Sequence, residues 1–204
     1  HHAWLTFGCD LALGSPTDQE ATPHEMLFLP DYLREAFAKA EIIDTQGQHR
    51  PLVSKTHVIE AAEPDELEKD LWDLLSPLRL GWLIFAITNV ITLLGRFQKR
   101  AYKGLDILLF GLAGLAGCVL FFLAFFSVHP CTWPNYSLLW LHPFHLVGVI
   151  LFCINKAQRA TYWYHFINFA ALTLLFAGWA FLPQQLNPAF IPLAASLWLR
   201  SARG

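Results

Sequence analysis

Apolar residues are concentrated in the second part of the chain, in runs long enough to cross a lipid bilayer. The runs cover residues 80–97, 105–128, 138–154, 164–182 and 186–199. A transmembrane helix needs about 20 predominantly apolar residues, so the first four runs are predicted spans. The last run is short and contains Pro192, and we predict it as a tilted fifth span, with a half-helix or an interfacial helix as alternatives. The pattern predicts an all-α transmembrane bundle of five helices.

The basic residues of this part predict its orientation. Residues 80–204 contain eight Lys and Arg residues, all at positions 96–103, 156–159 and 200–203, after the first, third and last runs. The loops at 127–137 and 183–189 contain none. Because basic loops stay in the cytoplasm, we predict a cytoplasmic C-terminus, with the N-terminus, residues 1–79 and the two uncharged loops outside. This arrangement requires an odd number of spans.

The first 79 residues have the opposite character. They contain 15 of the 16 acidic residues and few long apolar runs, which is typical of a solvated segment with a marginal core. Local patterns predict a helix at 31–40, short strands at 42–43, 52–53 and 58–59, and a helix at 60–73. We predict that residues 1–76 are a small α+β remnant, the C-terminal part of an incomplete periplasmic domain. The transmembrane domain is predicted at 77–204.

The uncharged loop after the second run is the most polar and aromatic patch of the membrane part. It reads HPCTWPNY at 129–136 and WLHPFH at 140–145. The pattern favours a structured interfacial loop braced by its prolines. The alternatives are the wall of a ligand-binding groove, a metal site of its histidines, or a nucleophilic Cys131. If the loop is a groove wall, the predicted substrate-binding residues are His129, Asn135, Trp140 and His142. No spacing is diagnostic of either chemistry, so we predict no metal, no cofactor and no catalytic residue.

Four other features have structural interpretations. Asp106, beside the basic loop, is predicted to be a solvated interface charge. Residues 111–117 read GLAGLAG, and small residues four apart favour close helix packing, within the chain or in a homodimer. His165 and Asn168 are predicted to hydrogen-bond to neighbouring helices. Cys9 has apolar neighbours and is predicted to be a buried thiol.

Two stretches of the chain resemble a known family. The first is FGCDLALGSPTDQEATPHEMLFLPDYL at 7–33, and the second is GLDILLFGLAGLAGCVLFFLAFFSVHP at 104–130, which continues to PNYSLLWLHPF at 134–144. They resemble the C-terminal half of the Lnb family of membrane proteins, in which a periplasmic thiol-enzyme-like domain precedes five transmembrane helices. The family includes bacterial lipoprotein N-acyltransferases.

The resemblance implies a role in lipoprotein N-acylation at the bacterial inner membrane, with a phospholipid as acyl donor and a lipoprotein as acceptor. The family's catalytic His and Cys lie in motifs that residues 1–79 do not contain. We therefore expect the chain to be the C-terminal piece of a longer protein and to be inactive alone. The alternative is a non-catalytic membrane anchor or scaffold for a periplasmic module, with a transporter as a distant third. Nucleic-acid binding has no support, because no basic patch is interleaved with aromatic residues in a soluble region.

Overall fold

The computed structural model describes residues 3–43, 45–57 and 75–203, and the chain forms two compact units. Unit 1 consists of residues 1–18 and 68–204, and unit 2 consists of residues 19–67. The predicted strand at 58–59 and the predicted helix at 60–73 lie outside the described residues.

The described residues of unit 2 form two helices and a hairpin. Helix α2 (Pro23–Met26) is followed by α3 (Pro30–Lys39), which confirms the helix predicted at 31–40. Strand β1 (Glu41–Ile43) pairs antiparallel with β2 (His49–Pro51), so the second strand lies three residues before its predicted position. None of the described residues of unit 2 is buried. The described part of this unit therefore has no apolar core of its own.

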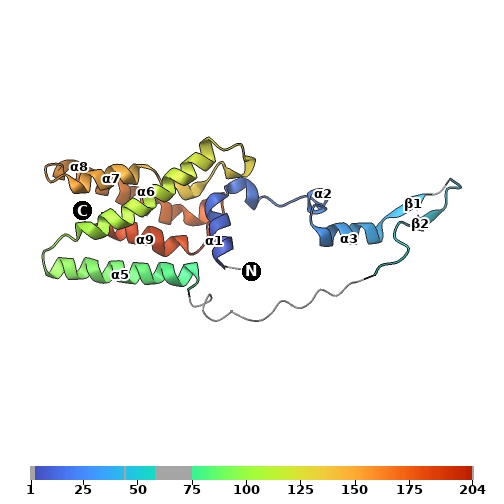
Figure 1. Cartoon of the computed structure of the whole chain (residues 1–204), viewed down its shortest axis with the longest axis horizontal. Helices are drawn as coiled ribbons and strands as arrows, with labels where there is room; N and C mark the ends of the chain where they lie inside the picture. Colours follow the sequence, from blue (N-terminus) through green and yellow to red (C-terminus); the bar gives the residue numbers. More distant parts are fainter. Residues whose placement is uncertain (1–2, 44, 58–74, 204) are drawn as a thin grey trace. The chain divides into compact units, whose positions relative to one another are not determined.

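In unit 1 the described helices that follow residue 76 run alongside one another as a bundle (Figure 1). They are α5 (Pro77–Phe97), α6 (Lys103–Phe125), α7 (Phe144–Cys153), α8 (Gln158–Gly178) and α9 (Phe190–Ser201). Four helical segments among the described residues are long and apolar enough to cross a membrane. They are Pro77–Phe97, Lys103–Phe125, Pro130–Cys153 and Gln158–Phe181. The prediction of a transmembrane bundle is therefore confirmed for four spans.

Helix α9 is too short to be counted as a fifth span. Its 12 residues give a length of about 18 Å, against a hydrocarbon core of about 30 Å. The predicted span began at residue 186, but residues 182–189 are not helical, and Pro183 and Pro188 interrupt this segment. The predicted count of five spans is therefore not confirmed.

Helix α6 approaches the segment around α7 very closely. A Cβ atom on Gly117 would lie 2.6 Å from the carbonyl carbon of His142, and one on Gly114 would lie 2.8 Å from Cδ2 of Leu146. These positions leave no room for a side chain. The GLAGLAG stretch therefore packs within the chain, which confirms the intramolecular interpretation.

Residues 3–18 pack on one end of the bundle, which we call the α1 end. Helix α1 (Ala3–Ala12) places Phe7 edge-on against Phe190 of α9, with ring centroids 5.2 Å apart. Phe7 and Leu11 are four residues apart and face the bundle, whereas Cys9 lies on the other side of the helix and is exposed. The prediction of a buried Cys9 is therefore wrong. Residues 1–18 form one unit with the bundle, and the predicted domain division between residues 76 and 77 stays a prediction.

The opposite end carries the α5–α6 connection, the α7–α8 connection and the C-terminus, and we call it the basic end (Figure 1). Here the prediction of a solvated Asp106 is wrong. Its side chain is 11% exposed and accepts hydrogen bonds from Arg200. Arg200 also donates a hydrogen bond from Nη1 to Oγ1 of Thr92, at 2.9 Å. Because α5, α6 and α9 converge there, the charge lies between helices.

Candidate functional site

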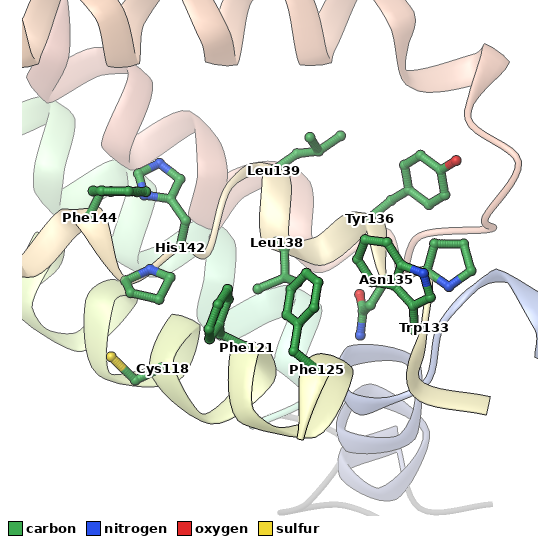
Figure 2. Close-up of a pocket in the computed structure, with 12 residues that line it drawn as sticks. Cys118, Phe121, Phe125, Trp133, Asn135, Tyr136, Leu138, Leu139, His142 and Phe144 are labelled. Atoms are coloured by element: carbon green, nitrogen blue, oxygen red, sulfur yellow. The ribbon is translucent and has the colours of Figure 1, made fainter. Parts of the chain in front are cut away.

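The chain segment between α6 and α7 forms an apolar groove with α6, at the α1 end of the bundle (Figure 2). We call it the α6 groove. Its volume of about 680 Å³ lies within the ~300–1,000 Å³ usual for small-molecule sites. Its apolar lining includes Phe121, Phe125, Trp133, Leu138, Leu139 and Phe144. Asn135 and His142 contribute polar side chains, and Tyr136 also lines the groove, with its hydroxyl directed away from the other lining residues (Figure 2).

One wall of the groove is a single face of α6. Cys118, Phe121 and Phe125 recur at helical spacing and all line the groove. At 1.5 Å per residue this face extends for about 10 Å along the helix. The Phe125 ring contacts the Trp133 ring across the groove, with centroids 4.7 Å apart. Helix α6 and the following loop therefore define the length and the end of the groove.

The groove is open on its side. Phe121 is 41% exposed, Leu139 is 47% exposed and Phe144 is 72% exposed, although all three line it. They belong to the second and third of the segments that are apolar enough to span. The exposed apolar side chains of the groove therefore lie in segments that are apolar enough to be in contact with lipid.

Asn135 holds the groove wall against α1. Its side chain is buried, and Nδ2 donates hydrogen bonds to the carbonyl oxygens of Leu11 at 2.9 Å and Ala12 at 3.2 Å. Its Oδ1 accepts a hydrogen bond from the backbone N–H of Ser137, at 2.9 Å. Asn135 thus joins the loop to the end of α1, and both ends of its amide have partners within the chain.

The other polar side chain of the lining belongs to His142. Its ring stacks on the ring of His145, with centroids 3.8 Å apart, and its buried Nδ1 has no hydrogen-bond partner among the described residues. His145 is fully buried and lies within hydrogen-bond distance of Tyr164 Oη and of the Trp140 carbonyl oxygen, at 2.7 and 2.9 Å. His145, held by these two contacts, therefore fixes the position of the His142 ring that stacks on it.

The remaining two predicted residues do not line the α6 groove. Trp140 is 3% exposed and packs against Phe190, with ring centroids 5.5 Å apart. It lines a smaller cavity of about 270 Å³ on the other side of α6, next to α1, α5 and α9. His129 is exposed on the loop. Of the four predicted residues, the structure brings only Asn135 and His142 to the groove.

The sequence reasoning missed the apolar side chains that make up most of the groove. Phe121 and Phe125 lie four residues apart on one helix face, which is a recognisable signal, but such a repeat is as typical of lipid-facing positions. Leu138, Leu139 and Phe144 carry no comparable signal. Their position depends on the close contact of Gly117 with the backbone of His142.

The alternative chemistries of the loop gain no support from the geometry. Among the described residues, no three His, Cys, Asp or Glu side chains are grouped as metal ligands. Cys131 is exposed and does not line the α6 groove. The site is thus an apolar groove with two polar side chains, which suits a long hydrocarbon chain better than a small polar substrate.

The part of the chain that contains this groove matches a known protein family. Residues 68–204 match the model of a family described as the Lnb transmembrane domain. No curated protein and no solved structure gives a match. The matched range covers more than half of the chain, from before α5 to the C-terminus, and includes the complete α6 groove. The chain therefore belongs to the Lnb transmembrane domain family.

Proposed function

We propose that the chain serves the N-acylation of bacterial lipoproteins, as a membrane domain that holds an acyl chain of the phospholipid donor in the α6 groove. The observation that carries this proposal is the groove itself, which is apolar, laterally open and part of two membrane-spanning segments. Membership of the Lnb transmembrane domain family supports the same role.

In this proposal the four predicted residues have different tasks. The acyl chain lies along the face of α6 that runs from Cys118 to Phe125. His142 offers its ring to the polar end of the lipid, and Asn135 keeps the wall in place. His129 is exposed on the loop, where it reaches the headgroup, and Trp140 packs behind the wall. Aromatic and polar side chains of this kind are suited to the bilayer interface.

The proposed reaction has two steps, and the groove contributes positioning to the first. A thiolate of the periplasmic domain attacks an ester carbonyl of the phospholipid, which forms an acyl thioester and releases a lysophospholipid alcohol. The amino group of the lipoprotein's N-terminal cysteine then attacks the thioester, which forms an amide and returns the thiol. No described residue is proposed as the nucleophile. A groove that fixes the acyl chain would hold the ester near the thiolate.

The α1 end would face the periplasm and the basic end the cytoplasm, and α9 would complete a fifth crossing. The basic residues of the connecting loops support this orientation. Phe190 at the start of α9 contacts Phe7 at the α1 end, and Arg203 after α9 donates a hydrogen bond to the carbonyl oxygen of Arg100 at the basic end. A short crossing is tolerated where the bilayer thins locally.

Cysteine labelling in whole cells tests this orientation. A variant that keeps only Cys131, which is exposed at the α1 end, should react with a membrane-impermeant maleimide. A variant whose only cysteine comes from Asn155→Cys, at the basic end, should react only after the cells are permeabilised. The opposite pattern would exclude the proposed orientation.

Photo-crosslinking tests the groove. A phospholipid with a diazirine in its acyl chain should crosslink to groove residues such as Phe121 when the chain is reconstituted in nanodiscs. Leu139→Trp should fill the groove and weaken that crosslink. Leu115→Trp is the control, because Leu115 is 58% exposed on α6 and does not line the groove.

The same two variants test the biological role. In cells whose lipoprotein N-acylation depends on this protein, Leu139→Trp should lower the N-acylated fraction of a reporter lipoprotein, and Leu115→Trp should not. If Leu139→Trp leaves acylation unchanged, the groove has no part in the reaction, and the role of a membrane anchor is favoured instead.

A further inference from the structure

A separate cavity lies at the basic end of the bundle, on the opposite end from the α6 groove. Its volume is about 270 Å³, and it is formed by the start of α6, the end of α7 and the start of α8. Its polar lining residues are Lys103, Asn155, Gln158, Thr161, Tyr162 and His165. The proposed function uses none of them. We call this site the basic-end cavity.

Two helices begin at this cavity. Lys103 is the first residue of α6 and Gln158 is the first residue of α8, and both line it. The residues that precede them, Tyr102 and Ala157, make no side-chain capping hydrogen bond. The first backbone N–H groups of a helix have no partner within the helix, and the helix dipole is positive there. Two helix N-termini at one cavity favour the binding of an anion there.

The charges around the cavity have the same sign. Lys103 donates a hydrogen bond from Nζ to Oδ1 of Asn155, at 3.2 Å, and so connects α6 to the α7–α8 connection. No acidic side chain among the described residues lines the cavity, and Lys156 and Arg159 lie in the same stretch of chain. Asp106, the one acidic residue after position 79, is paired with Arg200. The cavity thus contains a cation, Lys103, that has no carboxylate partner in the part of the chain that the structure describes.

His165 provides an independent observation. It is 4% exposed, lines the cavity and stacks on Phe152, another lining residue, with ring centroids 4.8 Å apart. Its Nδ1 is buried and has no hydrogen-bond partner among the described residues. Leaving a buried ring nitrogen unpaired costs free energy. A ligand with oxygen atoms in the cavity would remove that cost.

We propose that the basic-end cavity binds the phosphate group of an anionic phospholipid from the adjacent leaflet. Lys103 and the two helix starts would hold the phosphate, and His165 would supply a hydrogen-bonding group two turns further along α8. The apolar lining favours a lipid over free phosphate, because Leu151 and Ile154 also line the cavity. Ile154 is 48% exposed and directly follows the last residue of α7, at the end of the third candidate span. This site is independent of the α6 groove and of acyl transfer.

Binding measurements on the purified chain in detergent test the proposal. Native mass spectrometry should show tighter binding of phosphatidylglycerol than of phosphatidylcholine. Lys103→Ala should weaken phosphatidylglycerol binding about fivefold, the usual contribution of one cation near an anionic headgroup. Lys156→Ala is the matched control, because Lys156 is exposed in the neighbouring connection and does not line the cavity, and its effect should be clearly smaller.

A second variant distinguishes a loss of lipid binding from a loss of folding. Asn155 is exposed, so Asn155→Asp should keep the helical content while its carboxylate neutralises Lys103 and repels the phosphate. It should weaken phosphatidylglycerol binding at unchanged circular dichroism. Equal effects of Lys103→Ala and Lys156→Ala, or equal binding of both lipids, would overturn the proposal. Displacement of phosphatidylglycerol by millimolar inorganic phosphate would also overturn it, because the ligand would then be a free anion.

Discussion

Arg200 of α9 and Asp106 of α6 form a two-point ion pair inside the bundle. Nε of Arg200 donates to Oδ1 of Asp106 at 2.5 Å, and Nη2 donates to Oδ2 at 2.8 Å. The two residues are 94 positions apart in the chain, and both are buried. Planar pairing of this kind fixes orientation as well as distance. The pair therefore fixes the position of the short α9 against α6.

Removing one partner of this pair should destabilise the bundle. Asp106→Asn would leave the buried guanidinium of Arg200 uncompensated, at a cost of about 3–5 kcal/mol in the free energy of unfolding. Denaturant unfolding in detergent micelles measures this change. The double variant Asp106→Asn with Arg200→Gln should recover part of the loss, because no unpaired buried charge remains. Equal stability of the single variant and the native chain would show that the pair is not buried in the folded bundle.

The glycines of α6 provide a matched pair of substitutions. Gly117→Ala would force a methyl group against the backbone of His142, and overpacking of this kind costs about 1–3 kcal/mol. Gly111→Ala meets only Cγ2 of Val149 at 3.9 Å, which is ordinary contact, so it should be neutral or slightly stabilising. Thermal unfolding compares the two. Similar losses for both variants would contradict the close approach at Gly117.

Asn135 and His129 were predicted as equivalent ligand contacts, but their substitution should have different effects. Asn135→Ala removes three hydrogen bonds, to Leu11, Ala12 and Ser137, and leaves buried backbone groups unpaired, at about 1–3 kcal/mol. Hydrogen exchange should then rise in α1. His129→Ala changes an exposed side chain and should leave exchange in α1 unchanged. Unchanged exchange in both variants would show that Asn135 does not hold α1.

The stability of the first turn of α2 should depend on pH. The carboxylate of Glu25 accepts hydrogen bonds from the backbone N–H and the hydroxyl of Thr22, at 2.8 and 2.7 Å. These bonds lower the pKa of Glu25 below its ordinary value of 4.5. A lowered pKa in the folded state means that the stabilisation is complete above the ordinary pKa and is lost as the pH falls through the lowered one. The Thr22 amide resonance should follow this titration in NMR spectra, and Glu25→Gln should abolish it.

Predictions from the sequence were most accurate where a local pattern decides the structure. The helix at 31–40 was predicted from the local pattern of its residues, and the structure has it at Pro30–Lys39. The two polar groups of the groove, Asn135 and His142, were named because their loop is polar and aromatic. The apolar lining was not named, because a leucine or phenylalanine that faces a groove looks the same in sequence as one that faces lipid.

The errors have a common physical cause. Asp106 was assigned to solvent because its neighbours in sequence are basic, but its partner Arg200 comes from a helix 94 residues later. Cys9 was assigned to a core because its neighbours are apolar, but only one face of α1 contacts the bundle. In each case the decisive neighbour is distant in the chain.

The sequence by itself determined that the second part of the chain is a bundle of membrane-spanning helices, because apolar length and helix formation are local properties. Its motifs also indicated the Lnb family. Only the tertiary structure decided that α6 and the following loop form an apolar groove, that residues 3–18 pack on the bundle and that Asp106 is buried against Arg200. These features depend on close approach between distant segments, which side-chain size and pairing fix only after the helices have packed.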